Sequence, residues 1–317
     1  MQILEYFIIF VILLALELVY FRIADKLNII DKPTERSSHT QITLRGGGII
    51  FYFALVIFFI ISNLQYSYFF AGLTLISFIS FADDVRPQSR LLRLCIHFTA
   101  MLLMFFQWNL FEQHWYFAIF ALVICIGIIN AYNFMDGING ITGLYSFAVL
   151  ISLWFVNNFV IKGFVHNSLI YCVLLSLVVF GFFNFRKKAK CFAGDVGSVS
   201  MAFILIFLLG ILIIKTQNIS YIMLLSVYGV DSVLTIIHRI ILKENIFKPH
   251  RRHLYQILAN EKKMPHLLVS TIYAALQILI FIGLLVFADF ALLYSITVIV
   301  LLSIIYIILI KNLKTSL

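Results

Sequence analysis

Residues 201–214 read MAFILIFLLGILII and residues 291–310 read ALLYSITVIVLLSIIYIILI, and these two stretches decide the class of fold. Neither run alternates between apolar and polar residues, as the strands of a membrane barrel do. Continuous apolar runs approaching twenty residues instead have the length that crosses the hydrocarbon core of a bilayer as an α-helix. Similar runs recur from end to end of the chain, so the sequence predicts an all-α integral membrane protein.

The composition agrees with this prediction. The chain has 317 residues, of which 63% are hydrophobic and 12% charged, and its mean hydropathy is +1.06. A soluble domain carries about 25% charged residues. We therefore predict one transmembrane domain, residues 1–317, built as a polytopic bundle of eleven spans. The spans are expected near residues 3–24, 46–62, 68–82, 91–107, 116–131, 141–160, 168–184, 199–214, 220–238, 267–288 and 291–310.

The basic residues are distributed unevenly between the two sides of these spans. Of the 23 Lys and Arg residues, 21 fall in the loops of one side, and only Lys162 and Lys215 fall on the other. The positive-inside rule then predicts that the N-terminus lies outside and the C-terminus in the cytoplasm, in a bacterial inner membrane. The basic residues are spread over five loops, which favours contact with membrane lipid and argues against a nucleic-acid partner. The four cysteines form no Cys-x-x-Cys pair, which argues against a disulfide framework or a zinc site.

Four aspartates stand at the predicted cytoplasmic ends of spans. Asp83 and Asp84 close the third span, Asp136 follows the fifth, and Asp195 precedes the eighth. Carboxylates beside hydrocarbon are costly and usually mark a functional site. Mg²⁺ typically takes one or two carboxylates together with substrate phosphates and water, and this set can supply them. The alternative is that each aspartate only caps a helix end.

The surroundings of these aspartates favour a ligand site. Residues 130–140 read NAYNFMDGING and residues 192–198 read FAGDVGS, and the glycines allow backbone to approach a ligand closely. The second segment leads into the eighth span, so we expect backbone N–H groups at that helix start to face a phosphate.

A third polar cluster, PHRRH, occupies residues 249–253 of the longest cytoplasmic loop. If this stretch is helical, His250 and His253 share one face at a spacing of three residues. Together with Arg251, which can make bidentate contacts, they would hold a diphosphate. The alternative is a plain basic loop on the inner leaflet.

These motifs, in this order, resemble the polyprenyl-phosphate N-acetylhexosamine-1-phosphate transferases. That family includes the translocase of the first peptidoglycan lipid intermediate and the enzymes that start O-antigen synthesis. The resemblance covers nearly the whole chain. DKPTERSSH at residues 31–39 and RGGG at residues 45–48 resemble the O-antigen-initiating branch. In one position the chain departs from the family, because Asn139 stands where the second aspartate of Asp-Gly-x-Asp-Gly is usual.

The resemblance implies an activity, a cofactor and partners. It implies transfer of N-acetylhexosamine-1-phosphate, or of a 6-deoxy relative, from a UDP-sugar such as UDP-N-acetylhexosamine to undecaprenyl phosphate. UMP would leave, and a lipid-linked glycan of the kind used in lipopolysaccharide or cell-wall biogenesis would begin. Mg²⁺ is the implied cofactor, and a homodimer is allowed.

The same resemblance implies roles for individual residues. The expected metal ligands are Asp195 and Asp136. The expected catalytic residues are Asp83, Asp84, Asp136, His250 and His253. The expected substrate-binding residues are Arg36, His39, Arg45, Asn130, Asn133, Asn184 and Arg251. We expect Asn139 to offer at most a neutral contact to the nucleotide-sugar, and Asn139→Asp to shift the preferred sugar while UMP release continues.

A polytopic transporter with a polar site on the cytoplasmic side is the competing interpretation. Transporters place polar residues near the bilayer midplane, often at broken helices in two related halves. Here the polar residues gather on one face, and the halves show no repeat. The sequence therefore favours a membrane transferase.

Overall fold

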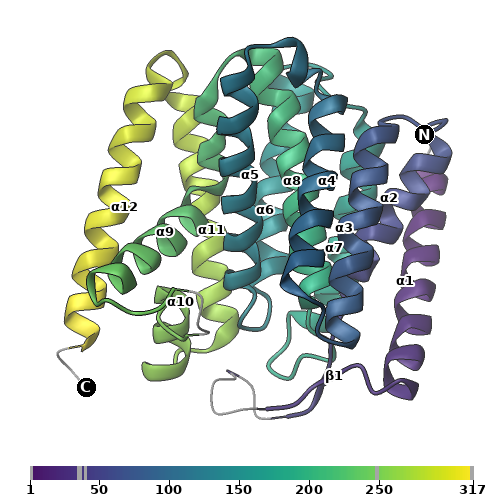
Figure 1. Cartoon of the computed structure of the whole chain (residues 1–317), viewed down its shortest axis with the longest axis horizontal. Coiled ribbons are helices and arrows are strands. Elements are labelled where there is room, and N and C mark those ends of the chain that lie inside the picture. Colours follow the sequence, from purple (N-terminus) through teal and green to yellow (C-terminus); the bar gives the residue numbers. More distant parts are fainter. Residues whose placement is uncertain (1–2, 34–37, 39–40, 247–249, 315–317) are drawn as a thin grey trace.

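The computed structural model describes residues 3–33, 38, 41–246 and 250–314. It is a bundle of long helices that stand roughly side by side, with the two termini at opposite ends of the bundle (Figure 1). The end that carries the C-terminus also carries β1 and α10, and we call it the site end (Figure 1). The expected all-α polytopic membrane fold is confirmed.

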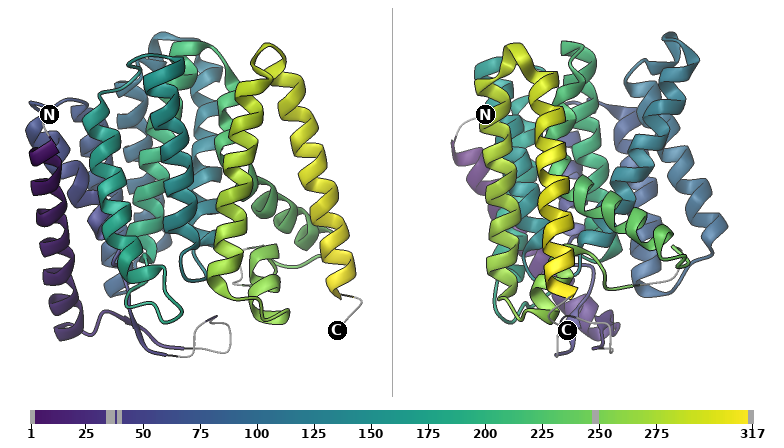
Figure 2. Two further views of the ribbon diagram at one scale, coloured as in Figure 1. Left: turned by 180° about the vertical axis from the view of Figure 1, so that it is seen from behind. Right: turned by 90° about the vertical axis from the view of Figure 1, so that its left-hand side faces the viewer.

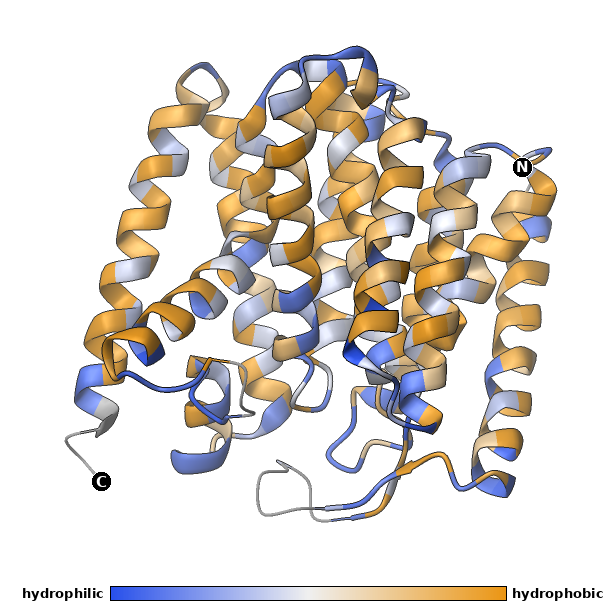
Figure 3. Ribbon diagram, viewed as in Figure 1, coloured by the Kyte–Doolittle hydropathy of each residue, from blue (hydrophilic) through white to orange (hydrophobic). Residues whose placement is uncertain are grey.

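The long helices are α1 (Ile3–Lys26), α2 (Ile49–Ile61), α3 (Ser67–Val85), α4 (Arg90–Gln107), α5 (Trp115–Met135), α6 (Ile141–Phe155), α7 (Asn167–Asn184), α8 (Gly194–Thr216), α9 (Ser226–Ile241), α11 (His266–Val286) and α12 (Ala291–Lys314). Shorter helical turns are η1 (Leu110–Glu112), η2 (Val156–Val160), η3 (Ile219–Leu225), α10 (Leu254–Gln256), η4 (Ile257–Glu261) and η5 (Ala288–Phe290). All eleven expected spans coincide with helices. Figure 3 shows that these helices are mainly hydrophobic along their length and that hydrophilic residues collect in the loops of the site end.

One expected span is shorter than predicted. Among the described residues, ten helical segments are long and apolar enough to cross a membrane, and α2, with 13 residues, is not one of them. At about 1.5 Å per residue, α2 is about 20 Å long, less than the hydrocarbon core. The reason lies in Gly46, Gly47 and Gly48, which the sequence assigned to the span. A Cβ on Gly48 would lie 2.2 Å from the Cα of Gly197, so these glycines serve a close backbone contact outside the helix.

The most buried long helix is α8, which packs against α3 and α5. Phe69 of α3 stacks on Phe207 of α8 with ring centroids 3.7 Å apart, and both side chains are buried. Because α8 is apolar on all sides, it is stable only where other helices surround it. The first turn of α8 therefore lies among the other helices at the site end. Asp195 is part of that turn.

A short antiparallel pair, β1 (Ile30–Asp31) and β2 (Thr43–Leu44), covers part of the site end. Leu44 also forms a parallel bridge with Cys191, just before α8. This bridge places the segment after β2 beside the start of α8, although more than a hundred residues separate them. The four cysteines are all unpaired, as the sequence predicts.

Helix α9 runs at a slant to its neighbours and reaches away from α5 toward α12 at the site end (Figures 1 and 2). Its outer face carries exposed apolar residues, among them Val233, Ile237 and Ile241. An exposed apolar face of this kind suits contact with lipid tails. The slant leaves an apolar cavity between α5 and α9.

Candidate active site

A polar cavity of about 230 Å³ lies at the site end, where loops from distant parts of the chain meet. It is lined by Asp31, Ser38, Arg45, Asn133, Asp136, Gly137, Ile138, Asn139, Asn184, Phe192, Gly194, Asp195, Ser198, Gln256 and His266. The structure thus brings together the expected metal ligands Asp136 and Asp195 with three of the expected substrate-binding residues, Arg45, Asn133 and Asn184.

Arg45 connects two of the expected acidic residues. Its Nε lies 2.6 Å from Oδ1 of Asp84, and its Nη2 lies 3.1 Å from Oδ1 of Asp195. Burial alone would lower the pKa of the Arg45 guanidinium, but the carboxylates of Asp84, Asp195 and Asp31 outweigh it and raise the pKa. Arg45 therefore stays charged and compensates the acidic residues around it.

Asp84 does not face the cavity, and its side chain is 0% exposed. Its two oxygens accept hydrogen bonds from the backbone N–H groups of Asp195 and Val196, each over 2.9 Å. The expectation that free N–H groups at the start of α8 face a phosphate is therefore wrong for these two groups. A carboxylate from α3 satisfies them because the helix start is packed inside the bundle, where an unpaired N–H is costly.

Asp83 also has protein partners. It accepts a hydrogen bond from the backbone N–H of Gln88 over 2.7 Å, and Nη1 of Arg93 lies 2.9 Å from its other oxygen. Both partners belong to the turn between α3 and α4 or to α4 itself. Asp83 thus holds the start of α4 and also contacts Asp195, whereas Asp84 holds the start of α8.

Asp136 directly follows α5 and lines the polar cavity. Its Oδ1 accepts a hydrogen bond from the hydroxyl of Thr142 over 2.7 Å. Burial raises the pKa of the Asp136 carboxyl to about 6, against the opposing effect of the Thr142 hydrogen bond. A carboxylate that titrates this close to neutral pH is a candidate functional group.

The expected asparagines have three different environments. Asn133 lines the polar cavity, whereas Asn130, one turn earlier on α5, is exposed and lines the apolar cavity instead. Asn184 is buried and joins two loops, because its Oδ1 accepts from the N–H of Gly140 and its Nδ2 donates to the carbonyl oxygen of Cys191, each over 2.8 Å.

The side-chain amide of Asn139 makes a further link between the same loops. It donates to the carbonyl oxygens of Arg186 and Lys187, over 2.9 Å and 3.2 Å. Its backbone carbonyl oxygen accepts a hydrogen bond from the hydroxyl of Ser270. Asn139 is therefore held on both sides by structural contacts, while part of it still borders the cavity.

The PHRRH cluster is not helical over its described residues, so the condition under which its histidines would share a helical face is not met. His253 precedes α10, and the His250 and His253 rings nevertheless lie 4.9 Å apart. His253 is 1% exposed, and its Nδ1 lies 3.5 Å from Oδ1 of Asp231 without the alignment of a hydrogen bond. Asp231 also accepts from the backbone N–H of Leu254 over 2.9 Å and from the hydroxyl of Tyr273 over 2.7 Å.

Of the two histidines in the PHRRH cluster, His250 is the one that lines a cavity. It lines the apolar cavity together with Arg239 and Phe134. Burial, with the charges of His253 and Arg239, lowers the pKa of His250 to about 4. His250 is therefore neutral at pH 7 and offers hydrogen bonds rather than charge. Arg251 is partly buried beside it in sequence.

This apolar cavity, of about 470 Å³, lies between α5 and α9. The last turn of α5 separates it from the polar cavity, because Asn133 lines one and the neighbouring Phe134 lines the other. Arg239 and His250 give its wall a polar part, and Arg239 donates to the carbonyl oxygens of Asn245 and Ile246. The site end therefore holds a polar and an apolar cavity side by side.

Two of the expected residues, Arg36 and His39, lie outside the described residues. Four further residues line the polar cavity although the sequence alone suggested no role for them: Asp31, Ser38, Gln256 and His266. Asp31 and Ser38 lie within the DKPTERSSH stretch at residues 31–39 that resembles the family. His266 had no such signal, and it reaches the site because α11 begins beside the turn between α5 and α6, where it accepts from the N–H of Asn139 over 3.5 Å.

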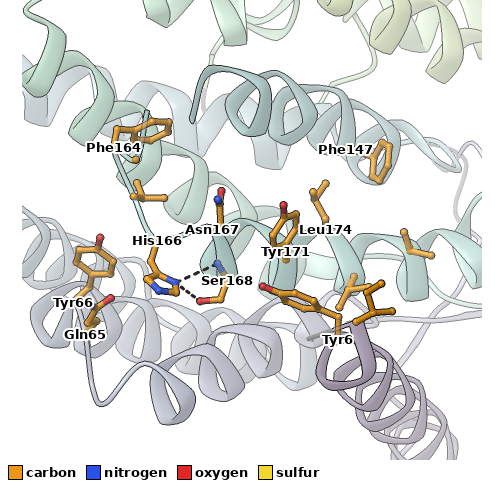
Figure 4. A pocket seen from close by; sticks show the side chains of 15 residues that line it. Tyr6, Gln65, Tyr66, Phe147, Phe164, His166, Asn167, Ser168, Tyr171 and Leu174 are labelled. Atoms are coloured by element: carbon orange, nitrogen blue, oxygen red, sulfur yellow. Dashed lines mark hydrogen bonds between the residues drawn. The ribbon is translucent and has the colours of Figure 1, made fainter. Parts of the chain in front are cut away.

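The largest cavity, of about 1110 Å³, lies at the opposite end of the bundle. Figure 4 shows its polar side chains, among them Tyr6, Tyr66, His166 and Tyr171, with the His166 ring hydrogen-bonded to Ser168. The residues lining it include no aspartate or glutamate. We therefore place the candidate active site in the smaller cavities of the site end.

A magnesium ion fits the donor set of the polar cavity. Asp136 and Asp195 supply carboxylate oxygens, and Asn133 and Ser198 supply neutral oxygens. Among the described residues, no group of three or more His, Cys, Asp and Glu side chains is assembled as a metal site. Mg²⁺ usually takes one or two protein carboxylates and completes its shell with substrate phosphates and water, so Asp136 and Asp195 could hold it together with a substrate.

Comparison with known proteins agrees with this geometry. A family described as glycosyl transferase family 4 matches residues 66–215. The phospho-N-acetylmuramoyl-pentapeptide-transferase of Thermotoga maritima is 28% identical, over 69% of this chain and 77% of its own length. A probable undecaprenyl-phosphate N-acetylglucosaminyl 1-phosphate transferase of Bacillus subtilis is 27% identical, over 75% of this chain and 71% of its own length.

The matched region contains Asp83, Asp84, Asp136 and Asp195, and with them two of the three aspartates that line the polar cavity. These matches agree with the order of the motifs and with the helical membrane fold. Over residues 66–215 the chain is therefore similar to glycosyl transferase family 4.

Proposed function

We propose that this protein transfers an N-acetylhexosamine-1-phosphate, or a 6-deoxy relative, from a UDP-sugar to undecaprenyl phosphate. The observation that carries this proposal is the pair of adjacent cavities at the site end, one polar and bearing carboxylates, the other apolar. An enzyme that joins a water-soluble substrate to a membrane lipid needs both kinds of surface within reach of each other. The similar protein of Bacillus subtilis, named as a probable undecaprenyl-phosphate N-acetylglucosaminyl 1-phosphate transferase, supports the same assignment.

In this proposal the polar cavity receives the UDP-sugar. Asn133 and Asp136 come from the end of α5 and Asp195 and Ser198 from the start of α8, so the diphosphate would lie where these two helix ends meet. Mg²⁺, when bound by Asp195 and Asp136, would neutralise negative charge on the diphosphate. Gln256 and His266 remain to contact the sugar or the nucleoside.

The apolar cavity receives the start of the polyprenyl chain. Its walls from α5 and α9 are mostly apolar, and the neutral His250 would hydrogen-bond the lipid phosphate at the polar part. Arg239 is buried and paired with Glu244, so it would support this part of the wall rather than bind the phosphate directly. The exposed apolar face of α9 would guide the rest of the chain into the bilayer.

The reaction forms one bond and breaks one. An oxygen of the lipid phosphate attacks the phosphorus linked to the sugar, and the bond from this phosphorus to the UMP oxygen breaks, so that the electron pair leaves with UMP. Phosphoryl transfer is catalysed mainly by positioning and charge neutralisation. Since the second pKa of a phosphate monoester is near 6, the nucleophile needs no strong base at pH 7. This leaves Asp83 and Asp84 to hold the site together, as their contacts suggest.

The test uses purified protein in lipid nanodiscs with Mg²⁺, undecaprenyl phosphate and a panel of UDP-sugars. We expect UMP to form only when the lipid phosphate and a suitable UDP-sugar are both present. UMP that forms equally well without the lipid phosphate would refute the proposal. Uptake of a sugar into sealed vesicles without any UMP release would favour a transporter instead.

We also propose that the site end faces the cytoplasm of a bacterial inner membrane, because the loops rich in Lys and Arg lie there. Reporter proteins fused after Lys188 and after Lys262 should read cytoplasmic, and one fused after Lys162 should read external. An external signal from the Lys262 fusion would contradict this orientation.

A further inference from the structure

The backbone of Arg45 is held in place by hydrogen bonds to two other segments of the protein. Its N–H donates to the carbonyl oxygen of Ile29 over 3.0 Å, and its own carbonyl oxygen accepts a hydrogen bond from the hydroxyl of Tyr20 in α1. The next residues continue this attachment, because the N–H groups of Gly47 and Gly48 donate to the backbone of residues 192 and 193. The position of the Arg45 side chain is therefore set by the fold.

The Nε and Nη2 atoms of Arg45 contact two aspartates that differ in solvent exposure. Nε lies against Asp84, whose side chain is 0% exposed and already accepts two backbone hydrogen bonds. Nη2 lies against Asp195, whose side chain is 24% exposed and lines the polar cavity. The Asp84 contact is shorter and fully enclosed, so it serves as the anchor. The Asp195 contact is longer and open to the cavity, so it is the one that a ligand can replace.

This contact opposes the binding of a bare cation. A divalent metal that approaches Asp195 meets a carboxylate oxygen already paired with a guanidinium, and a positive charge beside it. A diphosphate would offset the positive charge with its own negative charge. Its oxygens would also accept the hydrogen bond from Nη2 and so free the Asp195 oxygen. Arginine is well suited to this exchange, since its planar fork fits carboxylate and phosphate oxygens alike.

We propose that Arg45 makes divalent-cation binding at Asp195 conditional on a nucleotide diphosphate. In the free enzyme Arg45 occupies the Asp195 oxygen, and it releases this oxygen when a diphosphate supplies another acceptor for Nη2. The inference rests on the proposed function, in that it takes a UDP-sugar as the substrate. Because linkage is reciprocal, the nucleotide must also bind more tightly when the metal is present.

The test measures metal binding without turnover. Mn²⁺ is used as the probe, since it takes the same oxygen ligands as Mg²⁺ and its free form is quantified by electron paramagnetic resonance. In the wild type we expect weak Mn²⁺ binding that UDP strengthens by about tenfold or more, after the binary Mn²⁺–UDP complex is measured separately and subtracted. In Arg45→Gln we expect Mn²⁺ alone to bind about tenfold more tightly than in the wild type, and UDP to add little.

Arg93→Gln is the matched control. Arg93 also pairs with one of the two neighbouring aspartates, over 2.9 Å, and its side chain is 37% exposed against 34% for Arg45. Arg93→Gln removes the same charge from the same region and leaves the Arg45–Asp195 contact in place, while Asp83, the partner of Arg93, is itself a neighbour of Asp195. We expect Arg93→Gln to change Mn²⁺ affinity by less than about threefold, as for a partly exposed charge. Equal effects of the two substitutions, or no gain of affinity in Arg45→Gln, would overturn the proposal.

A second variant covers the case in which Arg45→Gln does not fold. Arg45→Lys keeps the charge but has one nitrogen, which cannot contact Asp84 and Asp195 as the guanidinium does. We expect Arg45→Lys to bind Mn²⁺ more tightly than the wild type and to weaken the coupling to UDP. Wild-type affinity in a folded Arg45→Lys protein would overturn the proposal. If the proposed function is wrong, the protein will neither release UMP nor bind UDP. The Mn²⁺ affinities of the Arg45 and Arg93 variants, measured without nucleotide, would still test the Arg45–Asp195 contact.

Discussion

The side-chain amide of Asn139 donates a hydrogen bond to the backbone carbonyl oxygen of Arg186, over 2.9 Å, and so joins the turn before α6 to the loop before α8. A second hydrogen bond from the same amide reaches the carbonyl oxygen of Lys187. The sequence alone suggested that Asn139→Asp would mainly change the preferred sugar. The contacts lead to a different expectation, because a carboxylate has no N–H to donate and would face two carbonyl oxygens.

We predict that Asn139→Asp lowers the stability of the protein by about 1–3 kcal/mol and reduces UMP release with every UDP-sugar. Thermal unfolding in detergent and initial rates measure the two effects. Asn139→Ala is the control, since it removes the hydrogen bonds without adding charge, and it should be less harmful than Asn139→Asp. A variant with an aspartate that is as stable as the wild type and turns over faster would contradict the prediction.

Replacement by asparagine should lower mainly the stability of the protein at Asp84, and mainly its activity at Asp195. Asp84→Asn disturbs a fully enclosed carboxylate that caps α8, so we expect a loss of at least about 2 kcal/mol in stability. Asp195→Asn changes a partly exposed side chain, so we expect a stability change below about 1 kcal/mol but a loss of UMP release of about 100-fold or more. Unfolding curves and rates on the same samples distinguish the two. If Asp195→Asn turns over like the wild type, Asp195 does not hold the metal.

The dependence of activity on pH should report Asp136. Since burial raises the pKa of this carboxyl to about 6, its negative charge is lost as the pH falls through that value, and we expect kcat/KM to fall with it. The Thr142 hydroxyl donates to the charged form and lowers the pKa of Asp136. Thr142→Val removes this donor at nearly constant volume, so the acidic limb of the profile should move to higher pH. An unchanged limb would show that another group controls it.

The apolar cavity can be filled at Gly229. This glycine lines the cavity on α9, and a Cβ placed on it meets nothing within 4 Å. We expect Gly229→Leu to raise the KM for undecaprenyl phosphate by about tenfold while the KM for the UDP-sugar changes little. Gly181→Leu on α7 is the control, because its Cβ also meets nothing within 4 Å and it lies away from both cavities of the site end. Equal effects of both substitutions would mean that the lipid does not use this cavity.

Helices α2 and α9 differ most clearly from what the sequence alone indicates. Hydropathy located both helices, because each carries enough apolar side chains to leave water for lipid or protein. It did not reveal that α2 is too short to span, or that α9 slants away from α5. Those features depend on Gly48 packing on Gly197, and on where the neighbouring helices leave room.

The sequence by itself determined the membrane fold, the helical spans and the gathering of polar motifs on one side, because local composition and period decide where helices form and which side their loops occupy. It also identified Asp136 and Asp195 as residues of one site. Only the tertiary structure decided the partner of each side chain. It placed Arg45 on Asp195 across 150 residues, enclosed Asp84 under α8, and brought His266 to the polar cavity. Such contacts follow from the packing of helices that are distant in the chain, and the short-range patterns of a single sequence do not encode which oxygen or nitrogen each side chain will meet.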